Sequence, residues 1–110
     1  MYGAGAGAAG ELLVALRRRY PRAMAYVADA ARDGEAGRLV RSHLGRTCPP
    51  ARPGDEEPAR ARARGRFTRN FVVQATAAEW ALVLLAELRL LLLHGPAELV
   101  FFQHDEVVLH

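Results

Sequence analysis

The sequence predicts an α+β fold, mostly helical, in which helices come first and a β-hairpin closes the chain. Three observations support this prediction. Leu12, Leu13 and Leu16 recur at helical spacing, a long run rich in Ala, Arg and Leu follows without any Pro, and the last eleven residues hold two apolar runs around a polar centre. At 110 residues the chain is one domain at most, with room for a modest core.

Two helices are predicted within residues 1–34. The first covers about residues 7–19, and its basic end at Arg17–Arg19 suits the C-terminal dipole. Pro21 interrupts the pattern and is compatible with the first position of a second helix, which runs to about Asp33. Gly34 and Gly37 are expected to end it. The residues that we expect this second helix to bury are Ala23, Tyr26, Val27 and Ala30.

The remaining elements follow from turn and breaker residues. Residues 38–48 are predicted to form a short hairpin that turns at Leu44-Gly45-Arg46, and residues 49–58 a loop rich in Pro and acids. A helix is predicted over 59–93, with a bend at Gly65 or Ala75, and Gly95-Pro96 ends it. Residues 98–110 are predicted to form a hairpin with strands at 99–103 and 107–109 around a tight turn.

Composition sets limits on partners. The net charge is +3 and every basic residue is Arg, which permits an anionic partner such as nucleic acid without requiring one. Cys48 is the single cysteine and is expected to be a reduced cytosolic thiol. The first ten residues lack the features of a signal peptide, so a cytoplasmic location is expected. Residues 75–93 are long enough for a membrane span, but they contain Glu79, Glu87 and Arg89, which favour a helix covered by protein and no contact with a membrane.

A row of hydrogen-bond donors is predicted on one face of the long helix. Arg66, Asn70 and Gln74 are four residues apart, so they share a face, and Arg62 lies one turn earlier. Phe67, Phe71, Val72 and Val73 are expected to mark the buried side. All base pairs offer acceptors in the minor groove, so such a row is suited to gripping a duplex without reading its sequence. From spacing alone, a solvated helix face is the simpler interpretation.

The closing hairpin carries an acidic turn. Phe101-Phe102 and Val107-Val108 are typical of strands buried on both sides, which leaves His104, Asp105 and Glu106 at or beside the turn. Carboxylates there are suited to binding Mg²⁺, with one of the two acids as the principal ligand because adjacent strand residues point to opposite faces. An ordinary polar turn is the alternative.

These segments resemble family A DNA polymerases, the bacterial DNA polymerase I family. "QHDEVV" looks like motif C, and "RFTRNFVVQATAAE" resembles the helix upstream of it. "MYGAGAG" resembles the end of motif B, and "HLGRT" resembles the hairpin between them. The order and spacing of these motifs agree with those of the family over the whole chain. The sequence most resembles the actinobacterial bifunctional 3′–5′ exonuclease/DNA polymerases. The resemblance implies fingers-type helices over 1–34, a DNA-contacting and buried palm helix over 59–93, and a palm hairpin over 98–110.

The resemblance also implies roles for single residues. Asp105 would be a catalytic carboxylate that binds Mg²⁺, with Glu106 beside it in support, and His104 would contact the primer terminus. Arg66, Asn70 and Gln74 would hold the primer–template minor groove. Tyr2 would shape the pocket of the nascent base pair. The implied partners are primer–template DNA and a deoxynucleoside triphosphate, in replication or repair.

The chain departs from the family pattern in several places. Ala75 stands where the family has Gly, and Glu79 stands where it has Asp. The motif A aspartate and the Lys and Arg of motif B are not among the 110 residues. We therefore expect a polymerase fragment, inactive by itself and with exposed apolar surface. The alternatives are a non-enzymatic duplex-binding module or decayed relic and, on the two acids alone, a small Mg²⁺ nuclease.

Overall fold

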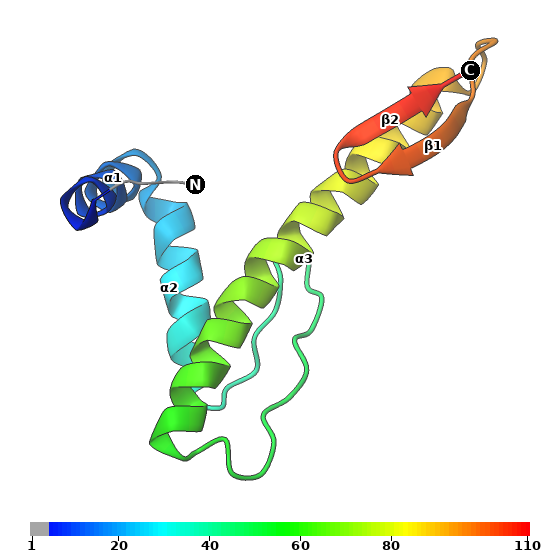
Figure 1. Ribbon diagram of the computed structural model, residues 1–110. Coiled ribbons are helices and arrows are strands. Elements are labelled where there is room, and N and C mark those ends of the chain that lie inside the picture. Colours follow the sequence, from blue (N-terminus) through cyan, green and yellow to red (C-terminus); the bar gives the residue numbers. More distant parts are fainter. Residues whose placement is uncertain (1–4) are drawn as a thin grey trace. The chain divides into compact units, whose positions relative to one another are not determined.

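The fold is α+β, with three helices followed by a two-stranded antiparallel hairpin (Figure 1). It was obtained as a computed structural model, which describes residues 5–110. The elements are α1 (Ala6–Arg19), α2 (Pro21–Glu35), α3 (Pro58–Leu92), β1 (Leu99–Gln103) and β2 (Glu106–Leu109). The chain divides into two compact units, of which the first ends at Val73 and the second runs from Gln74 to His110, so α3 passes from one to the other.

The boundary between α1 and α2 lies where the sequence predicts it. Tyr20 separates the helices, and its amide donates to the Leu16 carbonyl oxygen at 2.8 Å. Pro21 occupies the first turn of α2, where a missing N–H costs nothing. The prediction that Gly34 ends α2 is wrong, because the helix continues to Glu35 and the left-handed residue that follows it is Gly37, at φ 69°.

Small residues set the packing of α2 against α3 in the first unit. Ala30 is buried together with Val40, Cys48 and Val72, and Tyr26 packs against this cluster. The Thr68 hydroxyl is fully buried and donates to the Ala30 carbonyl oxygen at 2.8 Å. The expected burial of Ala23 is wrong, because Ala23 is exposed on α2, whereas Val27 is half-buried.

Gly34 is required at the α2–α3 contact. A Cβ atom on Gly34 would lie 2.0 Å from Thr68 Oγ1 and 2.8 Å from Thr68 Cγ2. Neither distance is compatible with van der Waals contact, so only glycine permits this approach. The Gly34 position therefore explains why a helix-weakening residue occurs inside α2.

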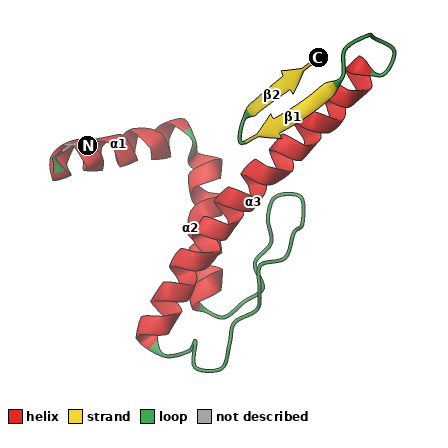
Figure 2. Ribbon diagram, turned by 45° about the vertical axis from the view of Figure 1, so that its right-hand side comes forward, coloured by secondary structure: helices red, strands yellow, loops and turns green. Residues whose placement is uncertain are grey.

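The segment after α2 is a loop that carries one bridge of hairpin type. Arg41 and Thr47 form an isolated antiparallel bridge, and the Cys48 amide donates to the Val40 carbonyl oxygen at 2.9 Å. Ser42 closes the turn, since its hydroxyl accepts from the Arg46 amide at 2.9 Å. The predicted hairpin over 38–48 is thus reduced to a single bridge. Figure 2 shows this segment and the following residues as loop.

The loop after residue 48 ends at Pro58, the first residue of α3. Gly54 adopts φ 91°, a conformation that glycine accepts readily. The helix that follows is continuous from Pro58 to Leu92, through both positions where a bend was expected, Gly65 and Ala75. Its final boundary is one residue before the predicted one.

The second unit contains the end of α3 and the hairpin, which lies alongside it (Figures 1 and 2). Phe101 pairs with Val108 and Phe102 with Val107, and an extra residue at Val100 shifts the register. The expected burial of both strand faces is not observed, because all four of these side chains are exposed in the described chain. The hairpin has only two strands, and the end of α3 beside it leaves all four side chains exposed.

Helix α3 is long and apolar enough to span a membrane by length and composition alone. Only 17% of its most apolar 18-residue window is buried. A single helix of this kind is weak evidence for a membrane span, and the expected covering of residues 75–93 by protein is not observed in the described chain. The expectation of exposed apolar surface is confirmed, most clearly at Leu91, which is 80% exposed.

Candidate nucleic-acid interface and acidic turn

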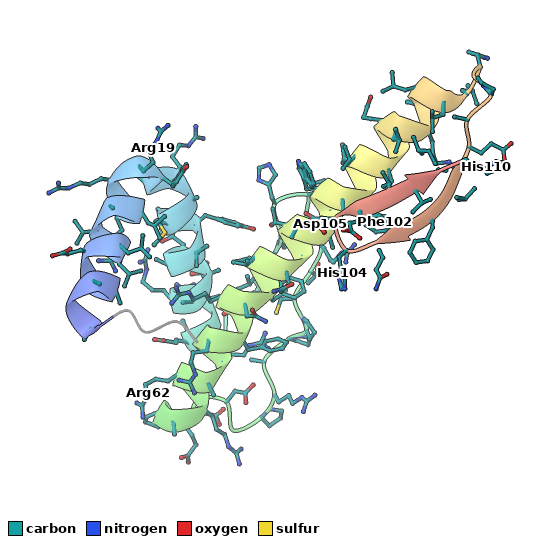
Figure 3. All side chains as sticks on the ribbon, turned by 45° about the horizontal axis from the view of Figure 1, so that its top comes forward. Arg19, Arg62, Phe102, His104, Asp105 and His110 are labelled. Atoms are coloured by element: carbon teal, nitrogen blue, oxygen red, sulfur yellow. The ribbon has the colours of Figure 1, made fainter. Side chains whose placement is uncertain are left out.

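The predicted donor row lies on an exposed face of α3. Arg62, Arg66, Asn70 and Gln74 are all exposed, and Figure 3 shows Arg62 projecting from the N-terminal part of this helix. The buried residues Gly65, Thr68 and Val72 recur on the other side of the helix, about half a turn away. The first three members of the row belong to the first unit, and Gln74 begins the second.

The buried face of α3 differs from the one that the sequence suggests. Val72 is fully buried and Phe71 is half-buried, as expected. Phe67 and Val73 are 47% and 48% exposed, so their expected burial is wrong. The helical period places Val73 close to the donor row, opposite Thr68. Phe67 lies at the edge of the buried face, next to the loop over residues 49–55.

The acidic turn lies at the tip of the hairpin. Gln103 pairs with Glu106, and His104 and Asp105 form the two-residue turn between them (Figure 3). His104 adopts φ 55°, a left-handed conformation that is unusual for a residue other than glycine. His104, Asp105 and Glu106 are all exposed.

The turn offers a partial magnesium site. Asp105 and Glu106 supply carboxylate oxygens, the ligand type that Mg²⁺ prefers. Within residues 5–110, no group of three His, Cys, Asp or Glu side chains is placed to hold a metal ion. Asp105 and Glu106 alone therefore do not complete a metal site within the described residues.

Tyr2, the residue expected at the nucleotide pocket, lies outside the described residues. Ala75 and Glu79, the two departures from the family pattern, are both buried on α3. Burial of a carboxylate at position 79 is costly unless it is partnered, and Glu79 does interact with other groups.

The Cys48 thiol is buried beside a guanidinium group. Burial raises the pKa of the Cys48 thiol, and the nearby Arg64 guanidinium partly offsets that rise. Arg64 Nη2 lies 3.9 Å from Cys48 Sγ and donates to the Pro49 carbonyl oxygen. The thiol thus stays protonated at neutral pH.

Sequence reasoning missed one feature of the first unit, a pocket of about 580 Å³ between the 49–55 loop and the start of α3. Prolines, arginines and an aromatic ring line it. The only signal in the sequence was the density of Pro and Arg in residues 49–64, which by itself is typical of any polar loop. The residues that line the pocket are Pro49, Pro50, Arg52, Pro53, Asp55, Arg60, Ala63, Arg64 and Phe67.

Comparison of the chain with protein-family models, with curated proteins and with solved structures gives no match.

Proposed function

We propose that this chain is part of a template-directed DNA polymerase of family A, covering the segment from the end of motif B to motif C. The observation that carries the proposal is the ordered set of motifs, in which "QHDEVV" spans the turn of an antiparallel hairpin. Two features support it: the exposed donor row on α3, and the exposed carboxylates at the hairpin tip. In this proposal residues 59–93 form the palm helix and residues 98–110 the palm hairpin, both in the cytoplasm.

The reaction would be the attack of a primer 3′-hydroxyl on the α-phosphate of a deoxynucleoside triphosphate. Mg²⁺ would neutralise developing charge on the phosphate oxygens. Asp105 would hold the metal, Glu106 would support it, and His104 would contact the primer end. Arg66, Asn70 and Gln74 would position the duplex by donating to minor-groove acceptors, which leaves the sequence of the template unread.

The 110 residues alone are not expected to catalyse extension, because two-metal phosphoryl transfer needs carboxylates from a further segment. The informative test is a chimera, in which this chain replaces the matching segment of an active family A polymerase. We expect primer extension by the chimera, and a loss on the order of a thousandfold in its Asp105→Ala variant, since a metal supplies several kcal/mol of transition-state stabilisation.

The control for this test is Glu57→Ala, which removes an exposed acid of the 49–57 loop and should leave extension unchanged. A chimera whose extension survives Asp105→Ala would refute the assigned role of that carboxylate. If the purified 110-residue chain extended a primer and its Asp105→Ala variant did not, the expectation that these residues alone are inactive would be refuted.

A second candidate is a duplex-binding module without enzymatic activity, favoured by the donor row on α3 and the net charge of +3. Binding to a primer–template would then be weak and steeply dependent on salt. Arg66→Gln should weaken binding to duplex DNA and make it less dependent on salt. A chain that binds duplex DNA with no salt dependence would exclude this candidate, and the absence of extension by the chimera would favour it over the polymerase.

A further inference from the structure

The pocket between the 49–55 loop and α3 has the size and the mixed lining of a ligand site. Its volume, about 580 Å³, lies within the range of small-molecule sites. Pro49, Pro50 and Pro53 supply apolar walls, and the α3 residues Arg60 and Phe67 supply a cation and a ring. All of its residues belong to the first unit, and none belongs to the donor row.

The acids near the pocket are engaged with the loop backbone. Asp55 Oδ2 accepts from the Arg52 amide at 2.7 Å, and Glu56 Oε2 accepts from the Gly54 amide at 2.8 Å. These two carboxylates fix the turn of the loop. Of the two, only Asp55 lines the pocket.

The basic side chains, by contrast, are not neutralised by neighbouring acids. Among the described residues, the guanidinium groups of Arg52 and Arg60 form no hydrogen bond or ion pair. Arg60 lies across Gly54, where an added Cβ would come within 2.5 Å of Arg60 Nη1. With Arg64 also in the lining, three cations outweigh the single Asp55 carboxylate, so the pocket favours an anion.

Phe67 gives the pocket an accessible aromatic surface. The Arg64 guanidinium carbon lies 5.3 Å from the centre of the Phe67 ring, within the range of a cation–π interaction. The Arg64 bond to the Pro49 carbonyl oxygen holds that guanidinium group in place. Phe67 is 47% exposed, and a planar group would stack on the ring face that Arg64 does not cover.

We propose that this pocket binds one nucleotide of a single-stranded nucleic acid, with the base against Phe67 and the phosphate between Arg52 and Arg60. Aromatic stacking combined with a basic groove is the usual basis of single-strand binding without sequence preference. An acidic peptide would satisfy the arginines but would leave the ring without a planar partner. The site is separate from the donor row on α3, and it does not depend on the polymerase assignment.

The test compares two labelled probes that carry equal numbers of phosphates. One is an oligothymidylate of about eight nucleotides, and the other is an abasic strand of the same length. Fluorescence anisotropy with the full chain should show roughly tenfold tighter binding of the oligothymidylate, as expected for stacking of one base. Phe67→Leu should remove this preference and leave the affinity for the abasic strand unchanged.

Charge variants test the phosphate contact. Arg52→Gln and Arg60→Gln should each weaken both probes equally, and the double variant, which leaves the phosphate without a cation, should lower the slope of log K against log salt by about 0.7. Arg22→Gln, which removes the same charge from an exposed position on α2, is the matched control and should change neither slope nor preference. Circular dichroism checks that each variant keeps its helical content.

Equal affinity of the wild-type chain for both probes would overturn the proposal, as would a base preference that survives Phe67→Leu. Competition by polyglutamate as effective as that by oligothymidylate would also overturn it and would assign the pocket to acidic peptides. A blunt-ended duplex without unpaired nucleotides that fails to bind would count against the α3 donor row, whereas binding of the single-stranded probes tests the pocket.

Discussion

Replacing Gly34 by Ala tests the described contact between α2 and α3. The new Cβ would lie 2.0 Å from Thr68 Oγ1, 2.8 Å from Cγ2 and 2.9 Å from Cβ of the same residue. Thr68 is branched at Cβ and sits on helix α3, so few rotamers are open to it. The helices must therefore move apart or the Thr68 side chain must turn away from the Ala30 carbonyl oxygen.

Opposing terms set the size of the effect. Alanine gains about 1 kcal/mol over glycine in a helix interior. Overpacking costs about 1–3 kcal/mol, and the lost Thr68–Ala30 hydrogen bond costs about 1 kcal/mol more. The expected result is a net loss of about 1–3 kcal/mol in the free energy of unfolding, measured by urea denaturation followed by circular dichroism.

Gly10→Ala is the matched control for this experiment. Gly10 lies inside α1, and an added Cβ would meet nothing within 4 Å, so this variant should be stabilised by up to about 1 kcal/mol. Adding Thr68→Ala to Gly34→Ala removes the atoms in collision, and the two changes should couple by at least about 0.5 kcal/mol. A Gly34→Ala chain as stable as Gly10→Ala would refute the described packing.

Three further predictions concern the buried thiol, the turn and the apolar surface. Because the pKa of Cys48 is raised in the folded chain, the thiol of the unfolded chain ionises first, and the free energy of unfolding should fall as pH rises above about 9.0. Cys48→Ala should remove that fall. If the free energy of unfolding of the Cys48→Ala chain depended on pH in the same way as that of the wild type, the burial of the thiol would be refuted. His104→Val places a β-branched residue at φ 55° and should weaken the hairpin by about 1–2 kcal/mol. This should be seen as faster amide exchange in both strands. Asp105→Asn should leave the exchange rates unchanged. The chain should self-associate in sedimentation velocity, less so with Leu91→Arg, and a monomeric wild-type chain would contradict this.

Element boundaries were predictable because strong local signals mark them. Pro21 starts α2 and Pro58 starts α3, and both fit the first helical turn, where proline is tolerated. The apolar runs around His104-Asp105 predicted the hairpin and its turn in the same way. Each of these signals acts within a few residues of the chain, so no knowledge of long-range contacts was needed.

The buried face of α3 was not predictable by the same reasoning. In the first unit that face is marked by small residues, Gly65 and Thr68, which allow close approach to α2, while the larger Phe67 and Val73 stay exposed. Apolar side chains occur all around this helix, so periodicity gives no single direction.

The pocket was not predictable for a related reason. It forms where the 49–55 loop lies against α3, and its fixed geometry depends on bonds such as the Arg64 contact with Pro49 across fifteen residues of sequence. Composition alone gives the residue types of this region but not which of them converge. The donor row, by comparison, was predictable because it depends only on the four-residue repeat of one helix.

One partner could both cover the exposed strands of the second unit and add ligands to its two carboxylates. Phe101 and Phe102 point to opposite faces of the hairpin, and both are exposed, although a stable sheet of this kind needs three or more strands or a covering helix. The carboxylates of Asp105 and Glu106 are likewise too few to complete a metal site. If the proposed function is right, a palm segment that adds strands to this hairpin would cover its apolar faces and bring the remaining carboxylate to the turn. Under that proposal, the exposed apolar surface and the incomplete acidic turn are two aspects of the same missing contact.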